Sequence, residues 1–222
     1  MQRLQGIGLG LLALLGLALV GVALEARRFG RTIQGYVDDL YSDADTPSGA
    51  EFGERDIRDL PEPVARYFEI VLEEGQTYVD TVVLRQRGEF CLGGPEGSWR
   101  RLAATQHFSA APPAFVWDAE IAMAPLLPAR VLDCYVRGAG ILRARVLSAI
   151  PVASVGPSPE MDEGELVRFL AEAVWFPTAL LPERGVAWEP IDDSSARATL
   201  SHGGSTATLI FHFDEDGLVE RV

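Results

Sequence analysis

The sequence predicts an α+β fold: an N-terminal transmembrane helix, then a curved antiparallel sheet, a half-barrel-like meander, with two helices packed on one face. Three observations predict it. The chain opens on a long apolar run, from Gly6 to Leu24, without one charged residue. Alternating apolar and polar residues, separated by turn residues, then fill most of the chain from residue 78 onward, as in half-buried strands. Two stretches have helical periodicity, one before these strands near residues 62–72 and one among them near residues 162–176.

The apolar run has the length of a membrane span. Nineteen residues at ~1.5 Å per residue give about 28 Å, close to the ~30 Å hydrocarbon thickness of a bilayer. We therefore expect residues 1–31 to form an anchor with a basic flank, which makes this a single-pass protein of the cell membrane. The side that the soluble part faces stays open, because Arg27, Arg28 and Arg31 favour a cytoplasmic body whereas the short basic start also fits a secretory signal.

The charge of the chain excludes one class of partner. Its 19 basic residues are all arginine, they face 32 carboxylates, and the net charge is −13. A body with this surplus of carboxylates repels nucleic-acid phosphates, so we expect no nucleic-acid binding. The same argument predicts repulsion from anionic lipid headgroups.

Composition divides the rest of the chain at residue 59. Residues 32–59 are acidic and poor in apolar residues, which predicts a juxtamembrane linker, although residues 25–41 can also continue the helix out of the membrane. Residues 60–222 form the α+β domain. A short helix opens at Leu60-Pro61-Glu62-Pro63. A second helix has Asp162 as its predicted N-cap and Glu165 three residues later, as in a capping box, and Pro177 ends it.

The strands between and after these helices are joined by short turns, which predicts antiparallel neighbours. If Gly138-Ala139-Gly140 is a three-residue loop, Asp133 lies opposite Arg145 and Tyr135 opposite Arg143. The last strand stops at Val222 without a polar tail, so we expect C-terminal strands to be missing and the domain to be truncated there. The predicted strands are residues 79–92, 98–110, 114–123, 130–137, 141–155, 186–191, 196–202, 206–213 and 218–222.

Motifs for catalysis and cofactors are lacking. The sequence holds no phosphate-binding loop, no G-x-S-x-G, no H-E-x-x-H and no C-x-x-C, which favours a non-catalytic protein without a cofactor. The spacing of the three histidines matches no metal-ligand pattern, so we predict no metal site. Cys91 and Cys134 form either a disulfide or, as their apolar surroundings favour, two free thiols.

Two groups of residues are candidate sites. The first is aromatic and either fills the core between the sheet and the second helix or lines a cleft for an apolar ligand such as an acyl chain; it comprises Trp117, Phe169, Trp175, Phe176 and Trp188. The second is polar and forms either cross-strand charge pairs on a solvated face or an acid/base pocket; it comprises Asp118, Glu120, Asp133, Tyr135, Arg143 and Arg145.

Several of these residues belong to a longer pattern. The stretches Trp117-Asp118-Ala119, Pro159-Glu160-Met161-Asp162, residues 168–182 and Phe213-Asp214-Glu215-Asp216-Gly217 resemble an uncharacterised bacterial family of membrane-anchored domains of unknown function, of the 6544/6920 type. The resemblance spans roughly residues 60–222. It implies an N-terminal span and further C-terminal strands, and it assigns no residue a role. In outline the predicted fold is also similar to the half-barrels of bacterial lipoprotein carriers.

These observations leave three functions open. The first is a membrane-anchored, non-catalytic domain that binds an apolar, lipid-like ligand or an envelope protein partner. The second is a structural or scaffold protein of the cell envelope. The third is an enzyme with an Asp/Glu/Arg cleft, which requires Asp118, Glu120 and Asp133 to converge with the arginines in one place.

Overall fold

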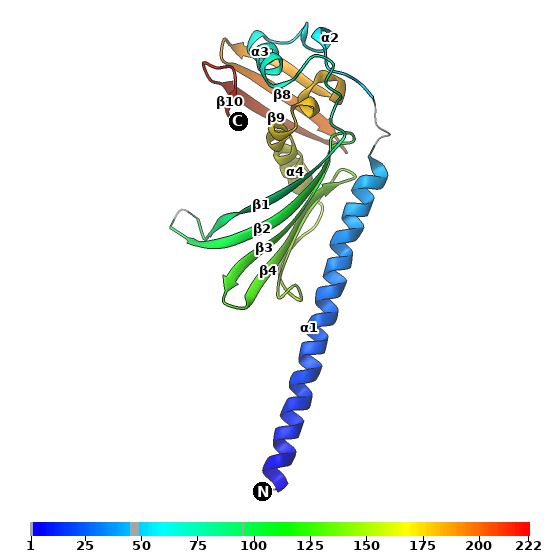
Figure 1. The fold of residues 1–222 in the computed structure, drawn as a ribbon, viewed down its shortest axis with the longest axis vertical. Helices are drawn as coiled ribbons and strands as arrows, with labels where there is room; N and C mark the ends of the chain where they lie inside the picture. Colours follow the sequence, from blue (N-terminus) through cyan, green and yellow to red (C-terminus); the bar gives the residue numbers. More distant parts are fainter. Residues whose placement is uncertain (1, 45–48, 95) are drawn as a thin grey trace.

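The computed structural model describes residues 2–44, 49–94 and 96–222, with side chains from residue 14 onward. The chain begins with one long helix, α1 (Gln2–Asp43), which runs beside the folded body and continues well past it (Figure 1). Within the described part of the chain, no helix combines the length and hydropathy that crossing a bilayer requires. The predicted span from Gly6 to Leu24 includes residues 6–13, whose side chains lie outside the described part.

Six strands form the first sheet, in which each strand pairs antiparallel with the next along the chain. This is the meander that the sequence predicted, and most predicted boundaries agree with it to within three residues. The strands are β1 (Thr81–Leu92), β2 (Ser98–Ser109), β3 (Ala114–Ala124), β4 (Leu127–Val136), β5 (Ala139–Val146) and β6 (Ile150–Val155).

The remaining strands form a second, separate antiparallel sheet in the order β10-β9-β8-β7. The α+β class is confirmed, whereas the single half-barrel sheet is wrong: there are two sheets and neither closes into a barrel. Helix α4 (Pro159–Glu172) and three 3-10 turns separate β6 from β7, so the chain begins a new sheet instead of extending the first one. The strands are β7 (Val186–Asp192), β8 (Ser195–His202), β9 (Ser205–Phe213) and β10 (Val219–Arg221).

The helices occupy three different places, and the two that the sequence predicted pack into one core with the four-stranded sheet. Helix α4 lies between the sheets, in contact with β4 and β5 of the first and with β8 and β9 of the second. Helices α2 (Glu54–Ile57) and α3 (Glu62–Val71) lie by the four-stranded sheet (Figure 1). Helix α1 covers the face of the six-stranded sheet opposite to α4, with contacts to β2, β3 and β4.

The contact between α1 and the sheet is apolar and extends for about three helical turns. Phe29, Ile33, Val37 and Leu40, spaced three or four residues apart on one side of the helix, are buried in a cluster with side chains of β3, β4 and β5. At one end of the contact Arg145 lies over the Phe29 ring, and at the other the Arg137 guanidinium donates to Asp43. Residues 32–43 of the predicted linker are therefore helix docked on the sheet.

Two hairpins differ from the sequence prediction for the same reason. Val136 pairs with Ala139, so the β4–β5 turn has two residues, Arg137 and Gly138, both with positive φ. The predicted strand 141–155 is in fact two strands, because Leu147 and Ser148 also adopt positive φ and turn the chain. Turn positions with positive φ favour Gly, Asn or Asp, so leucine, serine and arginine gave little signal.

Helix α4 begins earlier than predicted. Its N-cap is Ser158, whose hydroxyl accepts a hydrogen bond from the Met161 N–H, and Pro159 follows in the first turn. The predicted N-cap, Asp162, instead accepts a hydrogen bond from the Gly140 N–H at 2.6 Å and ties the helix to β5. Glu165 is consequently free of a capping role and lies buried between helix and sheet.

Candidate functional site

The candidate site lies on the face of the six-stranded sheet that α4 partly covers. Side chains paired across antiparallel strands share a face, so the register defines this surface. Toward the turns that join β1 to β2, β3 to β4 and β5 to β6, the surface is apolar, and we call it the distal apolar face. It consists of Leu102 and Ala104 on β2, Ala119 and Ile121 on β3, Ala129 and Val131 on β4, and Leu142 and Ala144 on β5.

The distal apolar face is open, because α4 packs at the other end of the strands (Figure 1). Four of its eight residues, Ala104, Ala119, Ile121 and Ala129, are buried, and the other four are partly exposed. At its margin Phe90 of β1 is 40% exposed and Ile150 of β6 is 53% exposed. An extended apolar molecule laid on this face would remove further apolar area from water, at about 25 cal/mol per Å².

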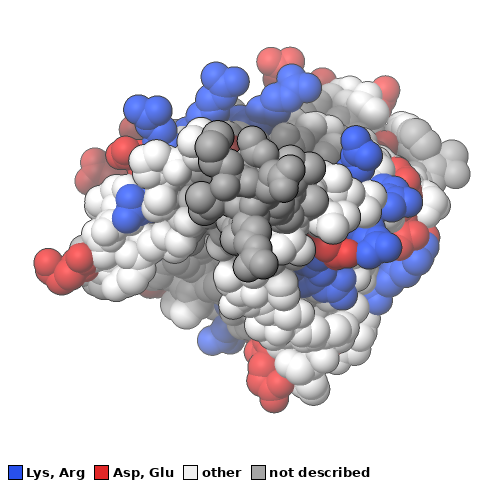
Figure 2. Space-filling view, turned by 90° about the horizontal axis from the view of Figure 1, so that it is seen from below, with Lys and Arg blue, Asp and Glu red and all other residues white. Residues whose placement is uncertain are grey.

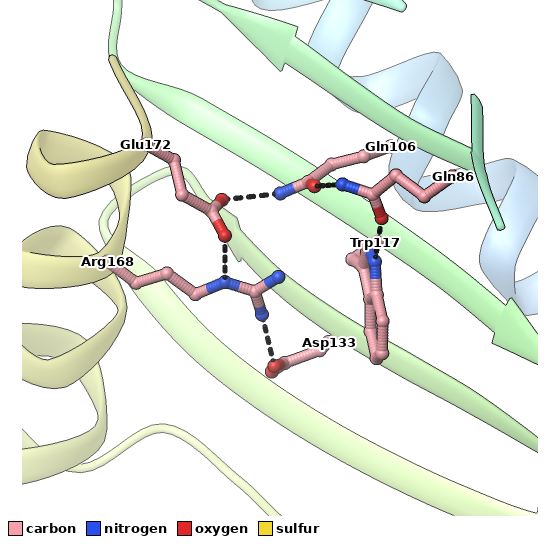
Figure 3. Close-up of polar contacts among 6 residues, drawn as sticks. All are labelled: Gln86, Gln106, Trp117, Asp133, Arg168 and Glu172. Carbon is pink, nitrogen blue, oxygen red and sulfur yellow. Dashed lines mark hydrogen bonds and ion pairs between the residues drawn. The ribbon is translucent and has the colours of Figure 1, made fainter. Parts of the chain in front are cut away.

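A chain of polar side chains closes the inner end of this face, beside α4 (Figure 3). On the sheet, Trp117 donates from Nε1 to Gln86 Oε1 at 2.7 Å, and Gln86 donates to Gln106 Oε1 at 3.0 Å. Gln106, which is fully buried, then donates to Glu172 of α4 at 2.6 Å. A buried polar chain with its partners satisfied fixes the relative position of sheet and helix.

Arg168 is the centre of the network on the helix side. Its Nε donates to Glu172 Oε1 at 3.0 Å, and its Nη1 donates to Asp133 Oδ2 of β4 at 2.5 Å. The guanidinium also lies over two rings, 4.7 Å from the Phe115 centroid and 5.3 Å from that of Trp117. Two carboxylates therefore face one guanidinium, so the network has no surplus of positive charge.

Asp133 has a second carboxyl neighbour, Glu165 of α4. The two groups are hydrogen-bonded, and burial together with the charge of Asp133 raises the pKa of Glu165 to about 8. Burial also raises the pKa of Asp133, against the charge of Arg168. Asp133 Oδ1 and Glu165 Oε2 have no donor among the described side chains if both groups are ionised. One proton held between them, on Glu165, satisfies the pair at neutral pH.

The predicted polar cluster is split between the two faces of the sheet. Asp133 and Tyr135 point to the α4 side, whereas Arg143 and Arg145 point to the α1 side, because Asp133 pairs with Leu142 and Tyr135 with Gly140. The expected opposition of Asp133 to Arg145 and of Tyr135 to Arg143 is therefore wrong. The turn is shorter than predicted and begins earlier in the chain, so the register differs by three residues, and an odd shift moves a side chain to the opposite face.

The other members of this cluster make no hydrogen bond to the network among the described residues. Asp118 accepts two hydrogen bonds from Arg130 on the α1 side, at 2.8 and 2.7 Å, and Glu120 is exposed on the same side. Tyr135 donates from its hydroxyl to the carbonyl oxygen of His202 at 3.1 Å, which ties β4 to the second sheet. Burial raises the pKa of Tyr135 to about 12.

The predicted aromatic group is also divided. Phe169 and Phe176 are buried in the main core, where both rings lie near Phe108. Trp188 is half-buried against Phe211, and Trp175 is 50% exposed beside the core. Of the five, Trp117 alone has a contact that places it in the polar network beside the distal apolar face.

Cysteines and histidines take no part in the network. Cys91 and Cys134 are free thiols; Cys134 is buried under α1 and Cys91 is partly exposed. Burial lowers the pKa of His107 and of His202, which contact Tyr41 and Tyr135 respectively. Over the described side chains, no group of three metal-ligating residues converges.

Sequence reasoning missed most of the network. Arg168 and Glu172 are four residues apart on α4, a spacing that is also typical of a solvated helix surface. Gln86 and Gln106 carry no local signal, because a polar residue on an alternating strand predicts exposure.

A family model described as a family of unknown function, DUF6544, matches residues 50–222. The chain belongs to this family. The DUF6544 match begins after α1 and includes both sheets, α4 and the whole polar network, so the candidate site lies within the family's own domain. No curated protein and no solved structure matched the chain.

Proposed function

We propose that this protein is a membrane-tethered, non-catalytic domain that binds a lipid-like molecule on its distal apolar face. One observation carries the proposal: an open apolar surface, built from side chains of four neighbouring strands, ends at a polar network anchored by Arg168. A molecule with an acyl chain and a polar head has the same division into two parts.

The charges of the network favour an uncharged head. Asp133 and Glu172 already compensate Arg168, so an anionic head would meet a network without surplus positive charge. A hydroxyl or ester group can instead exchange hydrogen bonds with Gln86 and with the Trp117 indole at the border of the face. The proposed ligand class is therefore an uncharged acylglycerol rather than a free fatty acid.

The tether in this proposal is the N-terminal half of α1. Described side chains from Leu14 to Leu24 are apolar and mostly exposed, and they lie where the helix has left the sheet (Figure 1). A bilayer would remove this surface from water. The distal apolar face lies at the same end of the body, so a lipid leaving the membrane would travel only a short distance to reach it.

One observation favours a second candidate function, an enzyme. Glu165 and Asp133 share a proton beside a guanidinium, and a carboxyl group with a pKa of about 8 could act as a general acid near neutral pH. A structural account explains the same pair, because it joins α4 to β4. The scaffold hypothesis remains the third alternative and requires a protein partner on the same apolar face.

Photolabelling tests the ligand. The full chain, reconstituted in lipid nanodiscs that contain a photoactivatable monoacylglycerol, should be labelled on peptides that carry residues 102–104, 119–121 or 129–131. Leu102→Glu should lower the labelling about tenfold, because a charge replaces apolar contact with the acyl chain. The measurement is the label per peptide by mass spectrometry.

Ala103→Glu is the matched control, since the neighbouring residue points to the α1 side and is exposed. It should leave the labelling unchanged. Equal loss in both variants, or labelling confined to peptides outside the distal apolar face, would contradict the proposal. Release of the acyl chain from the monoacylglycerol, lost in Glu165→Gln, would instead favour the enzyme.

A further inference from the structure

The end of the six-stranded sheet that lies farthest from the four-stranded sheet has a distinct geometry. The turns that join β1 to β2, β3 to β4 and β5 to β6 all lie there. We call this part the distal end; on the strands it runs from these turns up to and including the paired row Arg85, Thr105, Asp118, Leu132 and Arg143. Helix α1 reaches the sheet beside it, where Glu25 pairs with Arg145 and Gly30 approaches Arg130. Residues before 25 continue past this end of the body (Figure 1).

The distal end is basic although the chain is acidic. Together with the adjoining part of α1 it holds ten of the 19 arginines and five of the 32 carboxylates, which leaves nine arginines and 27 carboxylates for the rest. Figure 2, which views this end, shows arginine side chains along two of its sides and uncharged surface between them. The arginines are Arg27, Arg28, Arg31, Arg85, Arg87, Arg100, Arg101, Arg130, Arg143 and Arg145, and the carboxylates are Glu25, Glu89, Glu96, Asp118 and Glu120.

Most of these arginines lack an acidic partner. Within the described residues, three of the ten form ion pairs, namely Arg28 and Arg145 with Glu25 and Arg130 with Asp118. Of the eight described arginines away from this end, six pair with carboxylates, and only Arg58 and Arg221 form no ion pair. Unpaired cations on one surface are available to an anionic partner.

Exposed apolar side chains stand at the turns of the same end. Trp99, at the start of β2, is 64% exposed, and Leu126, in the β3–β4 turn, is 96% exposed with a φ of 60°. An exposed leucine in the left-handed backbone conformation contributes no buried apolar surface to the stability of the fold. Tryptophan together with arginine is typical of residues at the interface between lipid headgroups and hydrocarbon.

A hollow on the α1 side of the distal end has the size of a headgroup. It has a volume of about 330 Å³. Arg130 lines the hollow and also approaches Gly30, so the hollow lies beside α1. Its charged lining comprises Arg85, Arg87, Arg130, Asp118 and Glu120, of which Arg130 and Asp118 neutralise each other. Arg85 and Arg87 are therefore left to receive a phosphate oxygen.

We propose that the distal end docks on an anionic bilayer surface, with Trp99 and Leu126 at the level of the acyl chains and the arginines among the phosphates. The occupant is a lipid surface rather than a protein because the basic end, its apolar tips and the emerging apolar helix all face the same way. This inference uses the membrane tether of the proposed function and makes no use of the ligand site. It differs from the expectation, drawn from the net charge, that the body is repelled by anionic lipids.

Fluorescence quenching by brominated lipids tests the docking. The full chain is reconstituted in vesicles of phosphatidylcholine alone or with 40% phosphatidylglycerol, the acyl chains being brominated in each case. The signal of Trp99 is the difference between the wild-type protein and Trp99→Phe. We expect strong quenching of Trp99 in the anionic vesicles, and weak quenching in the neutral vesicles or in 0.5 M salt.

Charge variants make the test specific. Arg85→Gln/Arg87→Gln/Arg101→Gln should lower the docking constant on the order of 100-fold, since each arginine near an anionic surface contributes roughly fivefold. The matched control, Arg58→Gln/Arg197→Gln/Arg221→Gln, removes the same charge from exposed positions elsewhere on the body and should dock normally. Equal effects of the two triple variants would overturn the inference.

The outcomes separate docking from tethering. If the chain stays in the vesicles after washing at pH 11 but Trp99 is quenched in neither lipid, the tether holds and the docking inference is wrong. If the chain is washed out, the tether itself fails. Equal quenching of Trp99 in neutral and anionic vesicles would also contradict the role given to the arginines.

Discussion

The free energy of unfolding should fall as the pH rises from about 5 to 8, and Glu165→Gln should remove most of that fall. The folded state raises the pKa of Glu165 to about 8 from an ordinary value of 4.5, so between these values the folded protein holds a proton that the unfolded chain has lost. Each such proton costs about 1.4 kcal/mol of stability per pH unit as the pH rises, or roughly 4 kcal/mol over three units. Above pH 8 the loss is complete.

Urea denaturation of the full chain in a mild detergent, at pH 5.5, 7 and 8.5, measures this effect. Glutamine donates to Asp133 at every pH, so Glu165→Gln should be more stable than the wild type at pH 8.5 and similar to it near pH 5.5. The pKa values of His107 and His202 are lowered from 6.5 in the folded state, so stability rises as the pH rises toward 6.5, and both proteins share that contribution. Glu163→Gln, an exposed neighbour on α4, is the control. A constant difference between Glu165→Gln and the wild type at all three pH values would contradict the shared proton.

Gly203→Ala should destabilise the protein by about 2 to 5 kcal/mol. Gly203 lies in the β8–β9 turn against Gly138 of the β4–β5 turn, and a Cβ at Gly203 would lie 2.4 Å from the Gly138 Cα. Its φ is 61°, so a side chain there also adopts an unfavourable backbone conformation. The backbone conformation costs ~1 to 2 kcal/mol and the overpacking ~1 to 3 kcal/mol.

The neighbouring glycine separates these two causes. Gly204 also has a positive φ, 91°, but a Cβ there would meet nothing within 4 Å. Gly204→Ala should therefore lose only the backbone part, measured as the difference in urea midpoint at equal m-value. Should both variants lose the same stability, the close approach of the two turns contributes nothing, and another contact must hold the sheets together.

Individual helices and strands could be predicted because short stretches of the sequence specify where they begin and end. Prolines in the first turn and an apolar stripe predicted α3, and turn residues such as Gly203-Gly204 placed most strand ends. The predictions failed where an ordinary residue made an uncommon turn. Arg137, Leu147 and Ser148 have positive φ, and with them the register of β4 on β5 and the division between β5 and β6 were missed.

The candidate site could be predicted only in part, because it is shared by elements far apart in the chain. Asp133 was singled out as one of a pair of charged cross-strand partners, and its real partners, Glu165 and Arg168, lie on α4. A charged residue on an amphipathic helix gives the same pattern whether it meets water or a buried carboxylate. The pattern therefore contains no information about which of the two it meets.

The sequence by itself determined the α+β class, the antiparallel meander, the long apolar N-terminal segment and the net negative charge. Only the tertiary structure decided that the chain forms two sheets, that α1 docks on one face and α4 on the other, and that the arginines gather at one end. Composition sums charges over the chain, whereas a partner meets the charges of one surface. The register of the strands and the place where each helix packs determine which charges share that surface.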